Sequence, residues 1–258
     1  MLRFVFPCMP YTMGTVEPMF EEQREAARER GFETSLLSYE DLHQEQRVWV
    51  RPPGHPDETV VLRGWMLSPA DYALIEQRDW QLLTSAHQYS QCHFMGGWVE
   101  ALRGFTPDTV ELACEQGPVQ ELLARWGQAF VKDSVKSYSA EGLPIVSSWD
   151  ELVALKQKMD LYRGRDEDVL FFRQVESLEV DSELRLFVLH GIVHHPNAPL
   201  PARQLGEQVA SRIDAPFYSV DVIRRSDGVW RVVELGDGQV SDLKEWTPQQ
   251  FFSIWPSP

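Results

Sequence analysis

Cysteine is scarce in this sequence, with Cys8, Cys92 and Cys114 as the only three among 258 residues. They are too few and too scattered for a disulfide framework, and no CxxC pair indicates a zinc site. This usage is typical of a reducing compartment, so we predict a cytoplasmic location. Long apolar runs are lacking too. None approaches the roughly 18 residues that span a bilayer, and Met1–Pro7 is too short for a secretory signal. We expect no membrane partner.

Basic residues are also in short supply. The chain has 24 Lys and Arg against 39 Asp and Glu, a formal net charge of −15. Such an acidic chain repels phosphate backbones, so we expect no nucleic-acid partner. Three common motifs are absent as well: the Walker GxxxxGK[ST] loop, the GxGxxG dinucleotide fingerprint and the GxSxG nucleophile elbow. A composition of 43% hydrophobic and 24% charged residues is that of a globular protein. The length allows one large domain or two small ones.

The first hundred residues alternate between strand and helix patterns. Leu2–Phe6 and Phe32–Leu37 read as strands around a helix at Glu17–Arg30, and this β-α-β order indicates a parallel sheet. The helix has acids early and arginines late, and Gly31 is a plausible stop. Further expected elements are strands at Arg47–Val50, Thr59–Arg63 and Gln81–Thr84 and helices at Pro69–Arg78 and from Ala86. A glycine-containing segment at 96–107 then marks a boundary.

The second half is richer in β-branched and aromatic runs. Strands are expected at Thr109–Ala113 and Ala129–Lys132, with a helix at Pro118–Trp126. Another helix starts at Ser148, which has the capping-box form, and ends near Leu161. Four long runs read as strands of a larger antiparallel sheet: Val169–Val175, Leu184–Val193, Tyr218–Arg224 and Val229–Leu235. Helices are expected at Ala202–Arg212 and Thr247–Trp255.

A pair of acids is the strongest local signal. Asp227-Gly228 separates two strand patterns, and this dipeptide is typical of a two-residue hairpin turn. Such a turn places Asp221 opposite Glu234, with Cβ atoms about 4.5–5.5 Å apart. Two like charges so close need a cation between them, and oxygen ligands without Cys or His favour Mg²⁺. A different register, solvation or a salt bridge to arginine would also account for the pair.

Several cations could hold a phosphate. Lys132 ends an apolar strand beside a polar loop that also carries Lys136. A surface lysine at a strand end is the alternative. Glu183 and Arg185 share one face of a strand whose other residues on that face are apolar, so both need partners. They could contact a ribose hydroxyl and a phosphate, or pair with each other or with nearby acids. Arg63 could bind a substrate carboxylate or form a salt bridge between domains.

Five segments occur in an order that resembles the ATP-grasp superfamily, and more narrowly a clade of small, largely uncharacterised ATP-grasp domain proteins. They are Leu62–Leu67, Phe130–Lys136, Glu183–Gly191, Ser219–Val222 and Val233–Ser241. The resemblance spans nearly the whole chain. It implies a fold of class α/β plus α+β, in which a small pre-ATP-grasp α/β domain (1–105) precedes an ATP-grasp domain (106–258). The latter would comprise a smaller lid subdomain (106–175) and a larger metal-binding subdomain (176–258), which clasp ATP between them.

The resemblance also implies roles for individual residues around the nucleotide. By position, Lys132 resembles the phosphate-binding strand lysine, and Lys136 lies on the loop that closes over ATP. Arg173, Gln174 and Val175 fall in the hinge whose backbone reads the adenine.

The remaining roles concern ribose, phosphate and metal. Glu183 resembles the ribose acid and Arg185 a phosphate-side arginine, while Asp221 and Glu234 resemble the magnesium acids. Many ATP-grasp enzymes carry Glu-x-Asn at the metal, but here Gly236 stands at the asparagine position. The expected replacements are Asp237, Gln239 or water, and we include Asp237 in the predicted metal set.

The implied reaction is carboxylate–amine (or carboxylate–thiol) ligation through an acylphosphate, with release of ADP and phosphate. Arg185, Lys136 and Arg63 are the predicted catalytic side chains, and ATP and Mg²⁺ the predicted cofactors. The carboxylate would be a small molecule or a peptide, and a homodimer is the commonest assembly. Two alternatives stay open. One is a kinase-like phosphotransferase, and the other is a nucleotide-binding regulatory protein without turnover.

Overall fold

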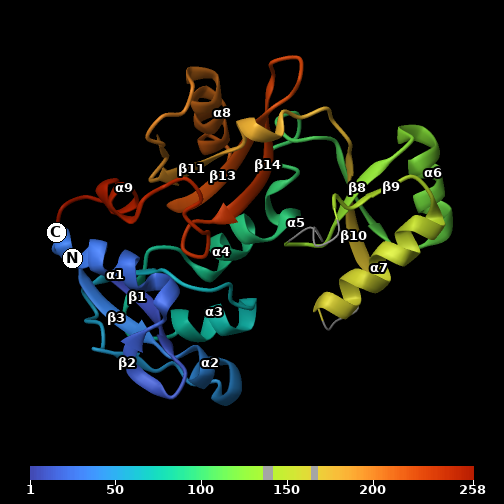
Figure 1. Cartoon of the computed structure of the whole chain (residues 1–258). Coiled ribbons are helices and arrows are strands. Elements are labelled where there is room, and N and C mark those ends of the chain that lie inside the picture. The colour runs from blue at the N-terminus through green and yellow to red at the C-terminus, as the bar shows by residue number, and fades with distance from the viewer. Residues whose placement is uncertain (136–141, 164–167) are drawn as a thin grey trace.

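The computed structural model describes residues 1–135, 142–163 and 168–258, which form three β-sheets in succession along the chain (Figure 1). The first sheet has the order β4-β3-β1-β5-β6, with β2 paired to β1. Its strands are β1 (Leu2–Met9), β2 (Thr12–Val16), β3 (Glu33–Leu37), β4 (Val50–Arg51), β5 (Thr59–Leu62) and β6 (Gln81–Leu82). The predicted parallel pairing is confirmed, because β1 lies parallel to both β3 and β5.

Short helices connect these strands and continue beyond them. They are η1 (Pro18–Phe20), α1 (Glu21–Glu29), α2 (Tyr39–Glu45), α3 (Pro69–Glu76), α4 (Ala86–His93) and α5 (Met95–Trp98). Gly31 follows α1 with φ +85°, a conformation that suits the predicted glycine stop. The strand expected at Arg47–Val50 is wrong in its bounds, since β4 begins only at Val50.

The second sheet is a small antiparallel layer with the order β7-β10-β8-β9. It contains β7 (Thr109–Ala113), β8 (Ala129–Lys132), β9 (Ile145–Val146) and β10 (Val169–Gln174), covered by α6 (Gln116–Trp126) and α7 (Trp149–Arg163). The expectation that Val169–Val175 belongs to the larger sheet is wrong. Leu170 and Phe172 pack in one core with Val131 of β8 and Val119 of α6, so β10 completes the small sheet instead.

The third sheet is antiparallel, with the order β12-β11-β13-β14. It contains β11 (Leu184–Leu189), β12 (Ile192–His194), β13 (Phe217–Arg224) and β14 (Trp230–Asp237), with η2 (Val180–Ser182), α8 (Leu200–Ala210) and α9 (Pro248–Ser253) around it. The single strand expected at Leu184–Val193 is in fact a hairpin. His190 and Gly191 both have positive φ, +49° and +78°, which is the backbone of a type I′ turn.

The two faces of the third sheet bury different cores. On one face, Val220 and Val232 pack with Cys92 of α4 and Leu205 of α8. On the other, Phe187 and Phe217 share a core with aromatic residues of the first sheet and of α9. The polar residues of the candidate site lie on this second face, between the first and second sheets (Figure 1).

The division of the chain at residues 105 and 175 stays a prediction. No helix in the described ranges is both long and apolar enough to cross a bilayer.

Candidate active site

A hairpin brings the two predicted acids together. In the β13–β14 ladder Asp221 lies directly opposite Glu234, so the predicted pairing is confirmed. The predicted two-residue turn is wrong, because Arg225 N donates to Val229 O at 2.8 Å and encloses a three-residue loop. Gly228 in that loop has φ +89°. A register shift next to Asp221 then adds one residue to β14 and restores the pairing. Two departures from a regular hairpin therefore cancel at the acids.

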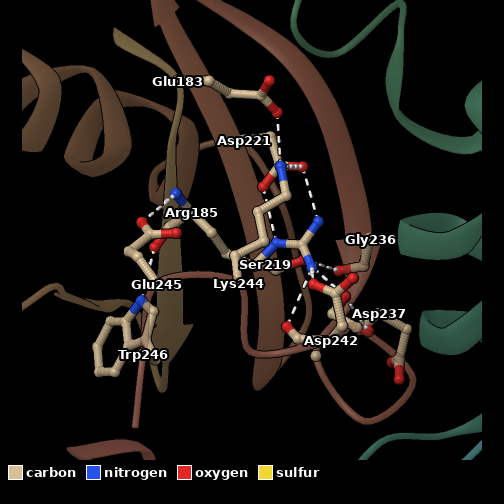
Figure 2. Close-up of polar contacts among 12 residues, drawn as sticks. Glu183, Arg185, Ser219, Asp221, Gly236, Asp237, Asp242, Lys244, Glu245 and Trp246 are labelled. Atoms are coloured by element: carbon tan, nitrogen blue, oxygen red, sulfur yellow. Dashed lines mark hydrogen bonds and ion pairs between the residues drawn. The ribbon is translucent and has the colours of Figure 1, made fainter. Parts of the chain in front are cut away.

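Asp221 is held by two cations (Figure 2). Arg185, its neighbour across β11, donates from Nε and Nη2 to the two carboxylate oxygens at 2.8 and 2.7 Å. Lys244 Nζ lies 2.9 Å from Asp221 Oδ2 and 2.5 Å from Glu183 Oε1. Burial alone would lower the pKa of Lys244, but the charge and hydrogen bonds of Asp221 and Glu183 raise it. The salt bridge to arginine that the sequence left open is present.

Arg185 is also fixed on its other side. Its Nη1 donates to Asp242 Oδ1 at 2.5 Å and to the Asp242 carbonyl at 3.0 Å, and its backbone N donates to Glu245 at 2.8 Å. The sequence reasoning did not single out Asp242, Lys244 or Glu245. The available signal was the polar segment that follows the last long strand.

Lys132 and Glu234 face each other from different sheets. Lys132 ends β8 with a side chain only 5% exposed, and its Nζ lies 3.7 Å from Glu234 Oε1. Burial lowers the pKa of Lys132, while the charge of Glu234 opposes that shift. The alternative of a surface lysine is therefore wrong. Glu234 itself stays 43% exposed at the side chain, which leaves its carboxylate open to a ligand.

Two cavities meet at Glu234. The first, of about 410 Å³, collects all the described residues that the resemblance assigned to the adenine, the ribose and the strand lysine: Lys132, Arg173, Gln174, Val175 and Glu183. The second, of about 540 Å³, is lined by Arg185, Asp221, Asp242 and Lys244, with Trp65 and Met66 on its apolar side. Glu234 lines both cavities, so a group bound in one lies next to a group bound in the other.

Arg63 does not reach either cavity. Its guanidinium is 1% exposed and donates from Nη1 to the carbonyls of Gly238, Gln239 and Ser241, while its Nε donates to Gln23. Burial lowers its pKa to about 10. Arg63 thus ties the segment after β14 to the first sheet, which corrects the prediction of a carboxylate-binding arginine.

Asp237 lies on the wrong face to join the other acids. It pairs with Tyr218 and points, as Tyr218 does, into the core shared with α4. Its Oδ1 accepts from Gln239 N at 3.0 Å and Gln239 Nε2 at 3.1 Å, and its Oδ2 has no hydrogen-bond partner among the described residues. Burial raises its pKa to about 7. We therefore leave Asp237 out of the metal set. The predicted Lys136 lies outside the described residues.

Two serines fill the space beside Gly236, where many ATP-grasp enzymes carry asparagine. A Cβ at this position would lie 2.9 Å from Ser241 Oγ and 3.0 Å from Ser219 Oγ. The two hydroxyls are 2.7 Å apart, and Ser241 donates to the Asp237 carbonyl at 2.8 Å. Both serines line the larger cavity. The oxygen atoms at this point thus come from Ser219 and Ser241, rather than from Asp237 or the buried Gln239 as expected.

The acids offer a limited set of metal ligands. Within residues 1–135, 142–163 and 168–258, no group of three or more His, Cys, Asp or Glu side chains is arranged to hold a metal ion. Asp221 has cations on both oxygens, and Glu234 is the open carboxylate. Such a donor set suits one Mg²⁺ that takes one or two protein carboxylates and most of its other ligands from phosphates and water.

This architecture, a small antiparallel sheet facing a larger one across a lysine and a carboxylate pair, is that of an ATP-grasp protein. Residues 76–254 match the model of an ATP-grasp domain family, the third family of its clade within the superfamily, and the chain belongs to that family. No curated protein matches the sequence.

Solved structures share the fold over almost the whole chain. A RimK domain ATP-grasp protein from Sphaerobacter thermophilus DSM 20745 superposes with TM-score 0.67 at 14% identity, covering 98% of both chains. D-cycloserine synthetase DcsG gives 0.66 at 17% identity, covering 98% of this chain and 97% of that chain. The D-alanine-D-alanine ligase from Coxiella burnetii gives 0.66 at 13%, covering 98% and 90%. Identities this low establish the common fold alone.

Proposed function

We propose that this protein is an ATP-dependent ligase that joins a carboxylate to an amine, or to a thiol, and releases ADP and phosphate. The observation that carries the proposal is the position of Glu234 on the wall shared by the two cavities. ATP in the smaller cavity would place its γ-phosphate beside Glu234, and an acceptor in the larger cavity would meet it there. The ligases and synthetases that share the fold support this class of reaction.

The smaller cavity has the groups that a nucleotide needs. Lys132 is a buried cation at its inner end, suited to a phosphate oxygen. Backbone groups of Gln174 and Val175 line the opposite end and would read the adenine edge. Glu183 would accept from a ribose hydroxyl once nucleotide binding draws it from Lys244.

Magnesium is part of the proposal. Glu234 would be its first protein ligand, with Asp221 joining when Lys244 withdraws from Oδ2. The ion would supply charge neutralisation at the phosphates, the usual contribution of a bound metal to phosphoryl transfer. Arg185 would keep Asp221 in place throughout, because its two hydrogen bonds to that carboxylate come from the neighbouring strand.

The reaction would proceed in two displacements. A substrate carboxylate oxygen attacks the γ-phosphorus, the bond to the β-phosphate oxygen breaks, and ADP leaves with those electrons. An amine nitrogen then attacks the acyl carbon of the acylphosphate, the carbon–oxygen bond breaks, and phosphate leaves while the nitrogen loses a proton. Lys132, Arg185 and Lys244 would stabilise the charge that moves onto the departing oxygens.

Calorimetric titration of ATP, with and without Mg²⁺, tests the nucleotide site first. We expect magnesium-dependent binding, weakened about tenfold or more in Lys132→Ala because a charge-assisted hydrogen bond is lost. Lys158→Ala is a control, since Lys158 lies on α7 and lines neither cavity. Release of ADP that depends on both a carboxylate and an amine would then identify a ligase. Release of AMP would contradict the acylphosphate route.

A nucleotide-binding protein without turnover is the second candidate. The observation in its favour is that Arg185 and Lys244 already neutralise Asp221, one of the two acids expected to hold metal. In that case Mg·ATP would bind, but no acceptor would cause ADP release. A stable phosphorylated product without any amine requirement would instead indicate a phosphotransferase.

A further inference from the structure

Glu234 reaches the cavities only because β14 contains a β-bulge. Val222 pairs with Val232, but the next residue along β13, Asp221, pairs with Glu234, so Val233 is the extra residue. Val232 and Leu235 consequently both face the core shared with α4 and α8. In a regular strand, residues two apart share a face, and Glu234 would follow Val232 into that core. The bulge turns its carboxylate to the side of Asp221.

The two carbonyl groups of the bulge are held by a side chain from another sheet. Arg173, on β10, donates from Nη1 to Val233 O at 2.6 Å and from Nη2 to Val232 O at 3.3 Å. The same Nη2 donates to the hydroxyl of Thr106. Because β14 is the edge strand of its sheet, these carbonyls have no ladder partner on the outer side. The guanidinium replaces that partner.

Arg173 is an unusual buried cation. Its side chain is 6% exposed, and within the described residues it forms no ion pair with a carboxylate, so its hydrogen bonds go to carbonyls and a hydroxyl. Burial lowers its pKa to about 10, and the charge of Glu234 is the main influence that opposes this shift. An isolated buried guanidinium is costly, and its contacts concentrate on the bulge next to the open carboxylate of the site.

We propose that Arg173 is a positioning residue that holds the β14 bulge and thereby sets the Glu234 carboxylate at the junction of the two cavities. This role belongs to its side chain and is separate from the backbone of 173–175, which lines the nucleotide cavity. It rests on the proposed function for its effect on magnesium, but not for its effect on the bulge. Arg173 would act through Glu234, without contact to the reacting groups.

The test compares Arg173→Lys and Arg173→Met with Arg231→Met. Arg231 is a matched control, since it also joins β14 to neighbouring segments, through Gly104 O, Thr106 O and Glu176, but touches neither bulge carbonyl. Calorimetry measures ATP affinity with Mg²⁺ and with EDTA. We expect both Arg173 variants to lose about tenfold or more in the magnesium-dependent part of the affinity. Affinity in EDTA should change less than about threefold, since Lys132 is untouched.

Equal losses with Mg²⁺ and with EDTA, or the same selective loss in Arg231→Met, would overturn the assignment. Hydrogen–deuterium exchange of the amides at 233–235, in protein without nucleotide, gives a readout independent of magnesium. Faster exchange there in Arg173→Lys than in Arg231→Met supports the assignment, and equal exchange refutes it. A wild type whose ATP binding ignores Mg²⁺ would contradict the proposed function, and the exchange result would still decide the role of Arg173. If Arg173→Met fails to fold, Arg173→Lys carries both measurements.

Discussion

Replacing the buried Asp237 by asparagine should stabilise the protein, and more so as the pH rises. The carboxylate has a pKa of about 7 in the folded chain, because burial disfavours its ionised form, against 3.8 when exposed. The folded state therefore keeps a proton that the unfolded chain has lost. Stability of the wild type falls as pH rises from about 4 to about 7, and the loss then stays constant.

The size of the effect follows from the pKa difference. A shift of about three pKa units corresponds to roughly 4 kcal/mol of lost stability above pH 7, of which roughly 1.6 kcal/mol is already lost at pH 5. Asparagine keeps an oxygen for the two hydrogen bonds from Gln239 and cannot ionise. The stability gained in Asp237→Asn should thus be about 2–3 kcal/mol larger at pH 8 than at pH 5.

Urea unfolding at both pH values measures this difference. Asp57→Asn is the control, since its side chain is 90% exposed and it removes the same charge from an acidic chain. We expect the control to change stability by less than about 0.5 kcal/mol at either pH. If Asp237→Asn and wild type lose stability in parallel between pH 5 and pH 8, the carboxylate is not held protonated and the reasoning is refuted.

Three other substitutions have defined outcomes. Gly236→Asn should cost about 1–3 kcal/mol in urea unfolding, because its Cβ meets two serine hydroxyls, and Gly236→Asn with Ser241→Gly should recover part of that loss. Lys244→Met should tighten Mn²⁺ binding by about tenfold in a metal titration without nucleotide, because the lysine no longer competes at Asp221; unchanged affinity would argue against a metal there. Arg3→Met should destabilise by about 3–5 kcal/mol, since it leaves the buried Glu58 without its partner. A loss below about 1 kcal/mol would show that solvent reaches that carboxylate.

The sequence predicted the acid pair for a reason that was only partly right. The Asp-Gly signal located the hairpin but not the length of its loop, since two-residue and three-residue loops use the same glycine. The bulge at Val233 is set by packing and by Arg173, which come from other parts of the chain. Asp237, in contrast, could have been placed from the sequence. It lies three positions from Glu234, and strand alternation puts such residues on opposite faces.

Other misses have similar physical causes. The run Leu184–Val193 looks like one strand because apolar residues continue through it, and only the glycine after His190 marks the type I′ turn. Arg63 looked available at a strand end, but the partner carbonyls that bury it lie about 175 residues later in the chain. Local patterns can predict which residues share a strand face. They do not predict which arginines find partners in another sheet.

The aromatic core shared by the first sheet and α9 sets an order for synthesis. Phe4 of β1 packs its ring edge-on against Phe252 and Trp255, with centroids 5.0 and 5.1 Å apart. The strand made first therefore waits for almost the last residues to leave the ribosome before its apolar face is covered. Until then a nascent chain exposes that face, which gives chaperones a binding surface and makes release from the ribosome the step that completes the fold.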